Sequence, residues 1–562
     1  MSTALTPHSV DSYLLVASGF IAALLLRRLV DGPSAQERID ANLPAFPPGL
    51  PFIGNVHQVA GRRPELQFTE WSKTLGPIFT VKMGVKRWIV LNSIDIVKDL
   101  IVDRGNIYSS RDLPEVLLNV LFRGDMGAPM PFMSYGDRWR QIRRIGEFRT
   151  QHFVLFIQQL SRSNLSEYSP SVILMHTAHS ALTKAKINNY QPIIDIRSNF
   201  MLKSLYEASC SSPENVVAPV AIFDFYTVST MFAVIFGVDI KPNDERIKRG
   251  NEVTQEATRL IGLPEQLMEF FPLLKNMPIK TAKLAAAIRS KTEAFWGEQY
   301  AGVKKRVQEG TAGECVLREV IAAQPKERLG DLQQSHIGSI LNSAGSETTS
   351  ITIQWMCAIL AHYPEIQEKA FAEIEQVVGL DRLPTENDEE NLPYIQCIIL
   401  ETLRYRAPAP VAIPHATSKD DTYRGYFIPK GTTVVINIHA IHNDPKRYPN
   451  PKLFNPERHM NYVRSTNNKI TPEFSERPHL AFSTGRRVCV GINMAERVLF
   501  IGIAKFLSCF RIQFPTDEFG SPVPIEIEKP KVGNGTTCIP RPYEVKLVPR
   551  HNGVGKLVGS EF

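Results

Sequence analysis

The stretch AFSTGRRVCVGIN, from Ala481 to Asn493, decides how this sequence is interpreted. Its single cysteine, Cys489, directly follows a pair of arginines and one valine, and the helical pattern INMAERVLFIGIAKFL begins three residues later. A thiol just before a helix N-terminus gains from the helix dipole and from free N–H groups, and neighbouring arginines add positive charge. We therefore expect a lowered pKa for Cys489 and a permanently ionised sulfur.

The neighbours of Cys489 favour a flat bound partner over a zinc site or a nucleophile. Gly485 and Gly491 allow the backbone to turn tightly and to approach such a partner, and Phe482 can shield the sulfur from water. Zinc sites use paired ligands, but none of the seven cysteines belongs to a C-x-x-C pair. A shielded thiolate is an axial ligand of haem iron, so the pattern indicates a metal macrocycle.

The spacing Phe482-x-x-Gly485-x-Arg487-x-Cys489-x-Gly491 resembles the haem-binding signature of the cytochrome P450 family. This resemblance implies that Cys489 is the axial ligand of the iron in haem b and that Arg487 binds a haem propionate. It also implies the cytochrome P450 fold, which is mainly α with a small β domain (α+β).

A second motif, ETLR, places Glu401 and Arg404 on one face of a predicted helix, where the two side chains can pair. Alone, such a pair is common and is usually a solvated surface contact. Here the motif precedes FNPERH, which contains Arg458. The resemblance implies a buried network of these three residues that supports the haem side of the fold. The family often has an aromatic residue at the position of His459, so the role of that residue stays open.

A third motif, LNSAGSETTS, lies within a long helical pattern. A glycine in a helix interior costs about 1 kcal/mol, and a charged residue here is unusual beside apolar neighbours. The motif is similar to the family's oxygen-activation sequence. By that resemblance Ala344 and Gly345 let dioxygen sit in the helix groove, while Thr348 and Glu347 are the catalytic pair that delivers protons.

A fourth motif, YGDRWRQIRR, puts Trp139 and Arg143 four residues apart on one helical face. An indole N–H and a cation that reach the same place suit a haem propionate, as the family's W-x-x-x-R motif implies. His415, in AIPHATS, fits a third propionate contact, although a lone histidine is more often structural.

Composition excludes several other function classes. The chain has 562 residues, is 43% hydrophobic and carries a net charge of +7. That charge is mild for this size, and no basic stripe with a nucleic-acid-binding module is present, so we expect no nucleic-acid partner. The odd number of scattered cysteines argues against a disulfide framework and for a reducing compartment.

The N-terminal segment YLLVASGFIAALLL is apolar and is followed at once by two arginines. It is short for a membrane span, and a cleaved signal peptide or a buried core helix are the alternatives. The charge pattern favours a single-pass anchor in the endoplasmic reticulum, with the catalytic domain facing the cytosol. The predicted organisation is an anchor (1–30), a proline-rich hinge (31–55), a haem-thiolate monooxygenase domain (56–550) and a C-terminal tail (551–562).

The resemblance implies a monooxygenase that hydroxylates or epoxidises a lipophilic small molecule, such as a terpenoid, polyketide or alkaloid, in a fungal secondary-metabolite pathway. Electrons would come from NADPH through a separate cytochrome P450 reductase, with cytochrome b5 as a further donor. A haem-thiolate isomerase or dehydratase that works without reductase, and a non-enzymatic haem sensor, are the alternatives. The predicted substrate-lining segments are Ser110–Pro131, Pro213–Pro272, the helix before Ala344, Ala409–Ile413 and Gly535–Ile539.

Overall fold

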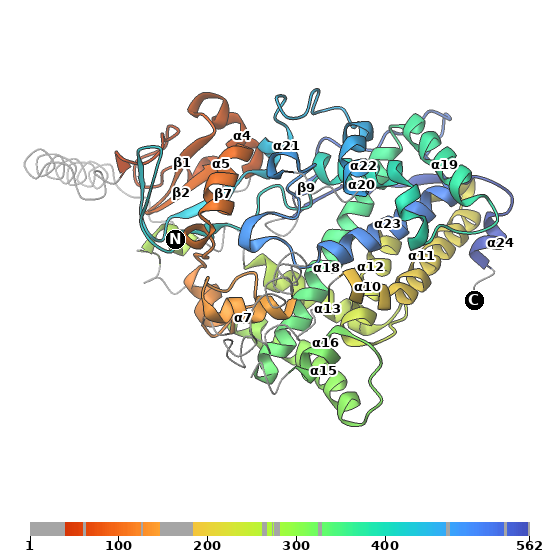
Figure 1. Ribbon diagram of the computed structural model, residues 1–562, viewed down its shortest axis with the longest axis horizontal. Helices are drawn as coiled ribbons and strands as arrows, with labels where there is room; N and C mark the ends of the chain where they lie inside the picture. The colour runs from red at the N-terminus through yellow and green to blue at the C-terminus, as the bar shows by residue number, and fades with distance from the viewer. Residues whose placement is uncertain are drawn as a thin grey trace, which may run out of the picture.

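The protein has a β-rich side and a larger helical side (Figure 1). The computed structural model describes residues 40–59, 63–124, 127–146, 182, 184–260, 267–272, 274, 281–323, 329–467, 473–532 and 537–559. The sheet of β1, β2 and β7 lies at one end, and the long helix α18 crosses the middle of the molecule beside α12 and α23 (Figure 1). The predicted mainly α fold with a small β domain is confirmed.

Helices make up most of the described chain. The α-helices are α3 (Val56–Val59), α4 (Pro64–Leu75), α5 (Ile94–Val97), α6 (Gly105–Tyr108), α7 (Asp137–Gly146), α10 (Lys184–Asn189), α11 (Gln191–Ser211), α12 (Val220–Phe236), α13 (Glu245–Arg259), α14 (Leu267–Phe270), α15 (Thr281–Gln308), α16 (Val316–Ala322), α18 (Asp331–Leu360), α19 (Pro364–Val378), α20 (Pro393–Tyr405), α21 (Ile438–His442), α22 (Met460–Asn467), α23 (Ile492–Cys509) and α24 (Val554–Gly559). The short π and 3-10 turns are η1 (Lys98–Asp103), η2 (Val116–Leu121), η5 (Pro213–Asn215), η8 (Glu386–Asn391), η9 (Pro456–His459), η10 (Phe474–Glu476) and η11 (Gly485–Arg487).

The main sheet has the strand order β1-β2-β7-β4, formed by Ile78–Met83, Lys86–Leu91, Thr433–Ile436 and His415–Ala416. The β-branched residues of these segments suit a pleated, buried surface. β1 and β2 form an antiparallel hairpin, whereas β7 runs parallel to β2 and pairs Val435 with Val90. β4 closes the other edge and sets His415 opposite Val434.

Smaller sheets complete the β structure. β3 (Val216–Val217), β11 (Val545–Pro549) and β8 (Phe510–Gln513) form a three-stranded sheet. β5 (Asp421–Tyr423) pairs with β6 (Tyr426–Ile428), and β9 (Lys531–Val532) pairs with β10 (Cys538–Ile539). β6 and β7 lie on the two sides of a turn that contains Pro429 and Gly431.

The largest core lies between α12, α18 and α23. Ten consecutive residues at the C-terminal end of α18, from Ile351 to Leu360, are buried on all sides. Tyr226 of α12 donates a hydrogen bond to the carbonyl of Val498 on α23, at 2.9 Å. The buried half of α18 and the bond between α12 and α23 thus hold the core that lies behind the site.

The predicted Glu401–Arg404–Arg458 network is fully formed. The side chains of Glu401 and Arg404 are completely buried and share two hydrogen bonds of 2.8 Å. Arg458 lies 3.2 Å from the same carboxylate. His459, whose role the sequence left open, also bonds this carboxylate, at 2.8 Å. Burial acts to raise the pKa of Glu401, but the bonds from Arg404 and His459 outweigh it and lower this pKa to about 2.

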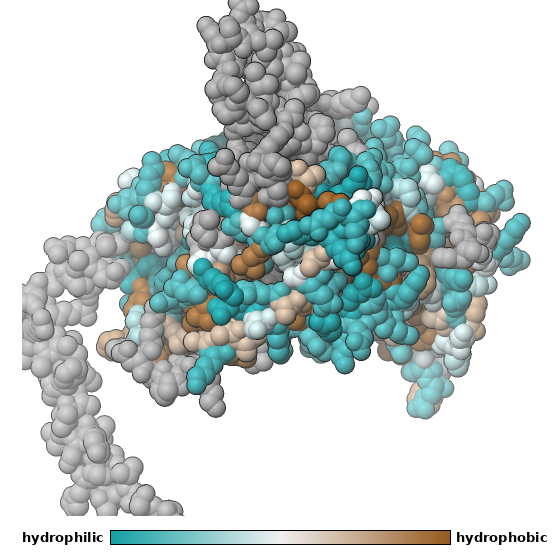
Figure 2. All heavy atoms as spheres, turned by 90° about the horizontal axis from the view of Figure 1, so that it is seen from below, coloured by the Kyte–Doolittle hydropathy of each residue, from teal (hydrophilic) through white to brown (hydrophobic). Residues whose placement is uncertain are grey.

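The face shown in Figure 2 is mostly hydrophilic where it is coloured, with smaller apolar areas between the polar ones. None of the helices within the described ranges combines the length and the apolar character needed to cross a bilayer. The predicted anchor, residues 1–30, lies outside the described residues, as does the hinge before residue 40. Within the predicted tail, α24 buries Val554 and Val558 in the main core.

We expect Glu401→Gln to lower the free energy of unfolding by about 3–5 kcal/mol, because it leaves Arg404 buried without its charge partner. The matched control is Glu70→Gln, since Glu70 pairs with Lys73 at the surface and its loss should cost about 0–1 kcal/mol. Chemical denaturation measures both values. Equal losses in the two variants would contradict the buried-pair interpretation.

The same network predicts an acid dependence of stability. Because the pKa of Glu401 is lowered on folding, its contribution is complete above the usual carboxyl range. That contribution is lost as the pH falls from about 4.5 towards about 2. Denaturation at a series of pH values should show this component in the wild type and a smaller one in Glu401→Gln.

Candidate functional site

The cysteine loop has one fixed backbone shape. Gly485 adopts a φ of +63°, and a Cβ there would lie 2.4 Å from the carbonyl oxygen of Ile101. Only glycine fits this close approach, so the residue serves the packing of the loop on η1. The amide of Cys489 donates to the carbonyl of Phe482 at 2.9 Å, and α23 begins just after Gly491.

Cys489 keeps exposed surface although protein atoms surround it closely. Burial raises the pKa of its thiol, and the Gly491 amide and the charge of Arg143 only partly oppose this. The prediction of a thiolate stabilised by its two preceding arginines is therefore wrong. Arg486 bonds the hydroxyl of Tyr135 instead. A bound metal ion deprotonates a coordinating thiol without such help.

Arg487 fastens the cysteine loop to the segment that precedes α7. Its guanidinium donates to the carbonyls of Ser109 at 2.8 Å, Met130 at 3.1 Å and Met133 at 2.6 Å. It also stacks on the ring of Trp139, 4.4 Å from the centroid. Arg143, one helical turn after Trp139, bonds the carbonyl of Val488. The structure thus brings three of the predicted propionate residues together around Cys489.

His415, the fourth predicted propionate residue, is buried next to the cations Arg111 and Arg487. Its Nδ1 bonds the carbonyl of Tyr108 at 2.7 Å, so Nδ1 carries the proton of the neutral ring. Burial and the charges of Arg111 and Arg487 hold the pKa of His415 well below its usual value. A carboxylate at Nε2 would reverse this preference and favour the imidazolium form.

Sequence reasoning assigned no individual role to Arg111. This guanidinium donates to the carbonyls of Pro131 at 2.9 Å, Ile413 at 2.7 Å and Pro414 at 2.8 Å. In the part of the chain that the structure describes it has no carboxylate partner, and burial lowers its pKa to about 9. The sequence YSSRD carries no periodic signal that singles it out. Its burial beside His415 identifies it.

The third motif lies within α18. Ala344 is exposed there, and the hydroxyl of Thr348, one turn later, donates to the Ala344 carbonyl at 2.8 Å. Glu347 accepts a hydrogen bond from Thr537, and burial raises the pKa of its carboxyl. At Gly345 a Cβ would lie 2.5 Å from the end of the Met231 side chain on α12. The glycine therefore serves helix packing; its predicted role toward dioxygen stays a prediction.

The sequence matches the family model described as Cytochrome P450 over residues 44–167 and 172–547. The chain belongs to the cytochrome P450 family. The match contains every predicted site residue, and family membership implies a haem-thiolate iron cofactor.

Similar proteins agree with this assignment. The chain is 29% identical over 524 residues to cytochrome P450 monooxygenase fogE of Aspergillus ruber, covering 92% of this chain and 89% of that protein. Monooxygenase virE of Hypocrea virens is 29% identical over 528 residues, covering 93% and 88%. A zebrafish cytochrome P450 solved with progesterone has the same fold, with a TM-score of 0.67 and 24% identity, covering 87% of this chain and 100% of that one. The protein is an enzyme of the cytochrome P450 monooxygenase class.

The residues of this P450 fit a haem. Within the described residues, Trp139 Nε1 and His415 Nε2 are buried and lack a hydrogen-bond partner, which suits the two carboxylates of the porphyrin. The same part of the chain contains no cluster of three or more His, Cys, Asp or Glu side chains that could hold a bare metal ion. An iron held by a macrocycle needs only one protein ligand, and Cys489 is placed to provide it.

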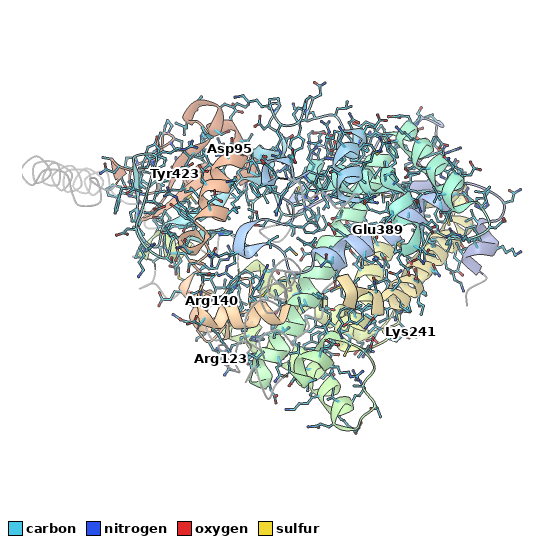
Figure 3. All side chains as sticks on the ribbon, viewed as in Figure 1. Asp95, Arg123, Arg140, Lys241, Glu389 and Tyr423 are labelled. Carbon is cyan, nitrogen blue, oxygen red and sulfur yellow. The ribbon has the colours of Figure 1, made fainter. Side chains whose placement is uncertain are left out.

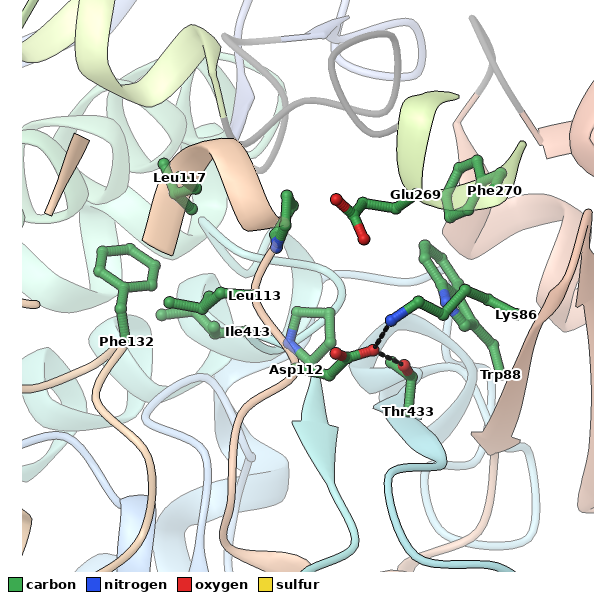
Figure 4. Close-up of a pocket in the computed structure, with 12 residues that line it drawn as sticks. Lys86, Trp88, Asp112, Leu113, Leu117, Phe132, Glu269, Phe270, Ile413 and Thr433 are labelled. Carbon is green, nitrogen blue, oxygen red and sulfur yellow. Dashed lines mark hydrogen bonds and ion pairs between the residues drawn. The ribbon is translucent and has the colours of Figure 1, made fainter. Parts of the chain in front are cut away.

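A small pocket, partly open to solvent, lies beside Ile413 and Pro414, whose carbonyls accept hydrogen bonds from Arg111 (Figure 4). Three predicted substrate segments meet in it, through Leu117, Phe270 and Ile413. Most of its wall is apolar, while Lys86 and Asp112 form an ion pair of 2.6 Å at one side (Figure 4). The complete lining is Lys86, Trp88, Asp112, Leu113, Pro114, Leu117, Phe132, Glu269, Phe270, Ile413, Pro414 and Thr433.

We expect Arg111→Leu to speed the loss of haem by about tenfold, because it removes a buried cation beside His415 that the carboxylates of a bound haem would compensate. Arg111→Lys keeps the charge and should fall between this variant and the wild type. Arg123→Leu is the control, since Arg123 pairs with Glu293 at the surface. Transfer of haem to excess apomyoglobin gives the rates. Equal rates for Arg111→Leu and the control would remove Arg111 from the haem site.

Proposed function

We propose that the protein is a haem-thiolate monooxygenase that hydroxylates or epoxidises a lipophilic small molecule with O2 and NADPH-derived electrons. The observation that carries this proposal is the exposed surface of Cys489, which protein atoms surround closely, in the same loop as Arg487 and its contact with Trp139. Haem b held by Cys489 supplies the activation of dioxygen.

The chain's own residues manage the protons of this reaction. Thr348 donates its hydrogen to the Ala344 carbonyl, so its oxygen lone pairs stay available to accept a bond. Burial raises the pKa of Glu347, and a raised pKa lets a carboxyl hold a proton closer to neutral pH and release it on demand. Retention of this acid–alcohol pair favours a monooxygenase over a haem-thiolate isomerase, a dehydratase or a haem sensor.

A separate NADPH-dependent P450 reductase is the proposed electron donor, with cytochrome b5 as an additional one, because the sequence contains no flavin or nicotinamide module. Basic residues of α7 are candidates for its docking, and Arg140 is labelled on this helix in Figure 3. Arg140 also pairs with Asp137 of the same helix. The apolar N-terminal segment supports attachment to the endoplasmic reticulum with the catalytic domain in the cytosol.

The apolar pocket supports a lipophilic substrate, such as a terpenoid, polyketide or alkaloid. Similarity to fungal P450 monooxygenases supports a role in secondary metabolism. A substrate-induced spectral titration against a panel of such compounds would identify the class.

We expect Cys489→His to abolish the thiolate-type spectrum of the reduced CO complex, together with NADPH-dependent turnover, even where haem is retained. Cys210→Ser is the matched control, because Cys210 is an exposed thiol on α11. A thiolate spectrum that survives in Cys489→His would refute the proposed ligand. A normal spectrum without turnover on any compound would refute the monooxygenase.

We expect Ile413→Phe to raise KM for bulky substrates by about tenfold, because the added ring fills space in the pocket. Leu380→Phe, at an exposed position after α19, should leave KM unchanged. The reduced CO spectrum should be the same in both variants. An unchanged KM in Ile413→Phe would show that substrate does not use this pocket.

A further inference from the structure

The C-terminal strand β10 is pinned to helix α18 at the level of the site. Trp355 of α18 donates its indole N–H to the carbonyl of Cys538 at 2.8 Å. The amide of Cys538 donates to the carbonyl of Pro408, also at 2.8 Å. Tyr543, further along, bonds the Gln354 carbonyl of α18 at 2.7 Å. The backbone next to Thr537 therefore has a fixed position relative to this helix.

Thr537 uses this position to hold the carboxyl of Glu347. Its hydroxyl donates to Glu347 Oε1 at 3.1 Å. Within the described ranges, no lysine, arginine or histidine lies at ion-pair distance from Glu347. The contact engages one carboxyl oxygen and leaves the other for exchange of a proton.

The polar residues one turn before and after Glu347 on α18 form hydrogen bonds with other helices. Ser343, one turn before, bonds Thr254 of α13 at 3.2 Å. Ser350, one turn after, donates to Asp224 of α12 at 2.6 Å. The orientation of the Glu347 carboxyl thus depends on a residue from outside α18.

Asp224 is the charged group that acts on Glu347. Both of its hydrogen bonds, from Ser350 and from Gln354 at 3.0 Å, end on Oδ1. Burial first, and then the Asp224 charge, raise the pKa of Glu347, while the bond from Thr537 opposes them. Thr537 is therefore the group that favours the ionised form of the carboxyl.

We propose that Thr537 is a positioning residue for Glu347, which links the C-terminal segment predicted to line the substrate pocket with the proton supply of the reaction. The proton-supply part rests on the proposed monooxygenase function. The alternative is a purely structural bond that only satisfies a buried carboxyl.

An infrared titration of the haem-loaded, full-length protein tests the link without turnover. The Glu347 carboxyl band is assigned by its loss in Glu347→Gln. In Thr537→Val, which keeps the shape but removes the hydroxyl, we expect the band to move to higher frequency and its midpoint to rise by about one pH unit. Thr537→Ser should behave as the wild type. An unshifted band in Thr537→Val would overturn the proposal.

Turnover with NADPH and reductase provides the second readout. We expect Thr537→Val to form about tenfold less product per NADPH and more hydrogen peroxide, with KM nearly unchanged, and Thr537→Ser to restore coupling. The control is Thr516→Val, since Thr516 makes an exposed bond to Glu214 at 2.6 Å. Equal loss in Thr537→Val and Thr537→Ser would implicate packing instead and overturn the proposal. If the wild type forms no NADPH-dependent product, the proposed function fails, and the infrared titration still decides whether Thr537 controls Glu347.

Discussion

The guanidinium of Arg487 is the contact on which the rest of the site depends. It is nearly buried, and its three carbonyl acceptors lie more than 350 residues away in sequence, at Ser109, Met130 and Met133. These bonds join the cysteine loop to the segment that carries Arg111 and much of the pocket wall. The stacking of Arg487 on Trp139 adds α7 to the same assembly. One side chain thus joins the loop of Cys489, the segment of Arg111 and helix α7.

The structure brings the motif residues Arg487, Trp139 and Arg143 together, because a motif states which residues must be near one another. The motif pattern could not predict their partners. Arg487 bonds backbone carbonyls, His459 joins the Glu401 network, and Gly345 makes room for Met231. Each of these contacts is set by tertiary packing between distant segments, which no local pattern encodes.

The same limit explains why sequence reasoning assigned no individual role to two residues that lie within predicted substrate-lining segments. Arg111 and Thr537 belong to no periodic or motif pattern, and their significance comes from burial beside His415 and Glu347. The prediction of a lowered pKa for Cys489 was wrong for a related reason. Arg486 and Arg487 lie close to the cysteine in sequence, but in space they bond other partners. Burial is therefore the main influence on the pKa of the thiol.

Buried basic groups and buried carboxyls lie in two separate parts of the site. On one side, buried donors gather around Arg111 and His415, where desolvation lowers the pKa of both groups. A ligand that brings carboxylates would compensate this cost, which makes binding of such a ligand favourable. Between α18 and α12 the opposite holds, because Glu347 and Asp224 form no ion pair with a cation among the described residues, and the pKa of each is raised. The first side is arranged to accept anions permanently. The second holds two carboxyls whose burial favours the protonated form.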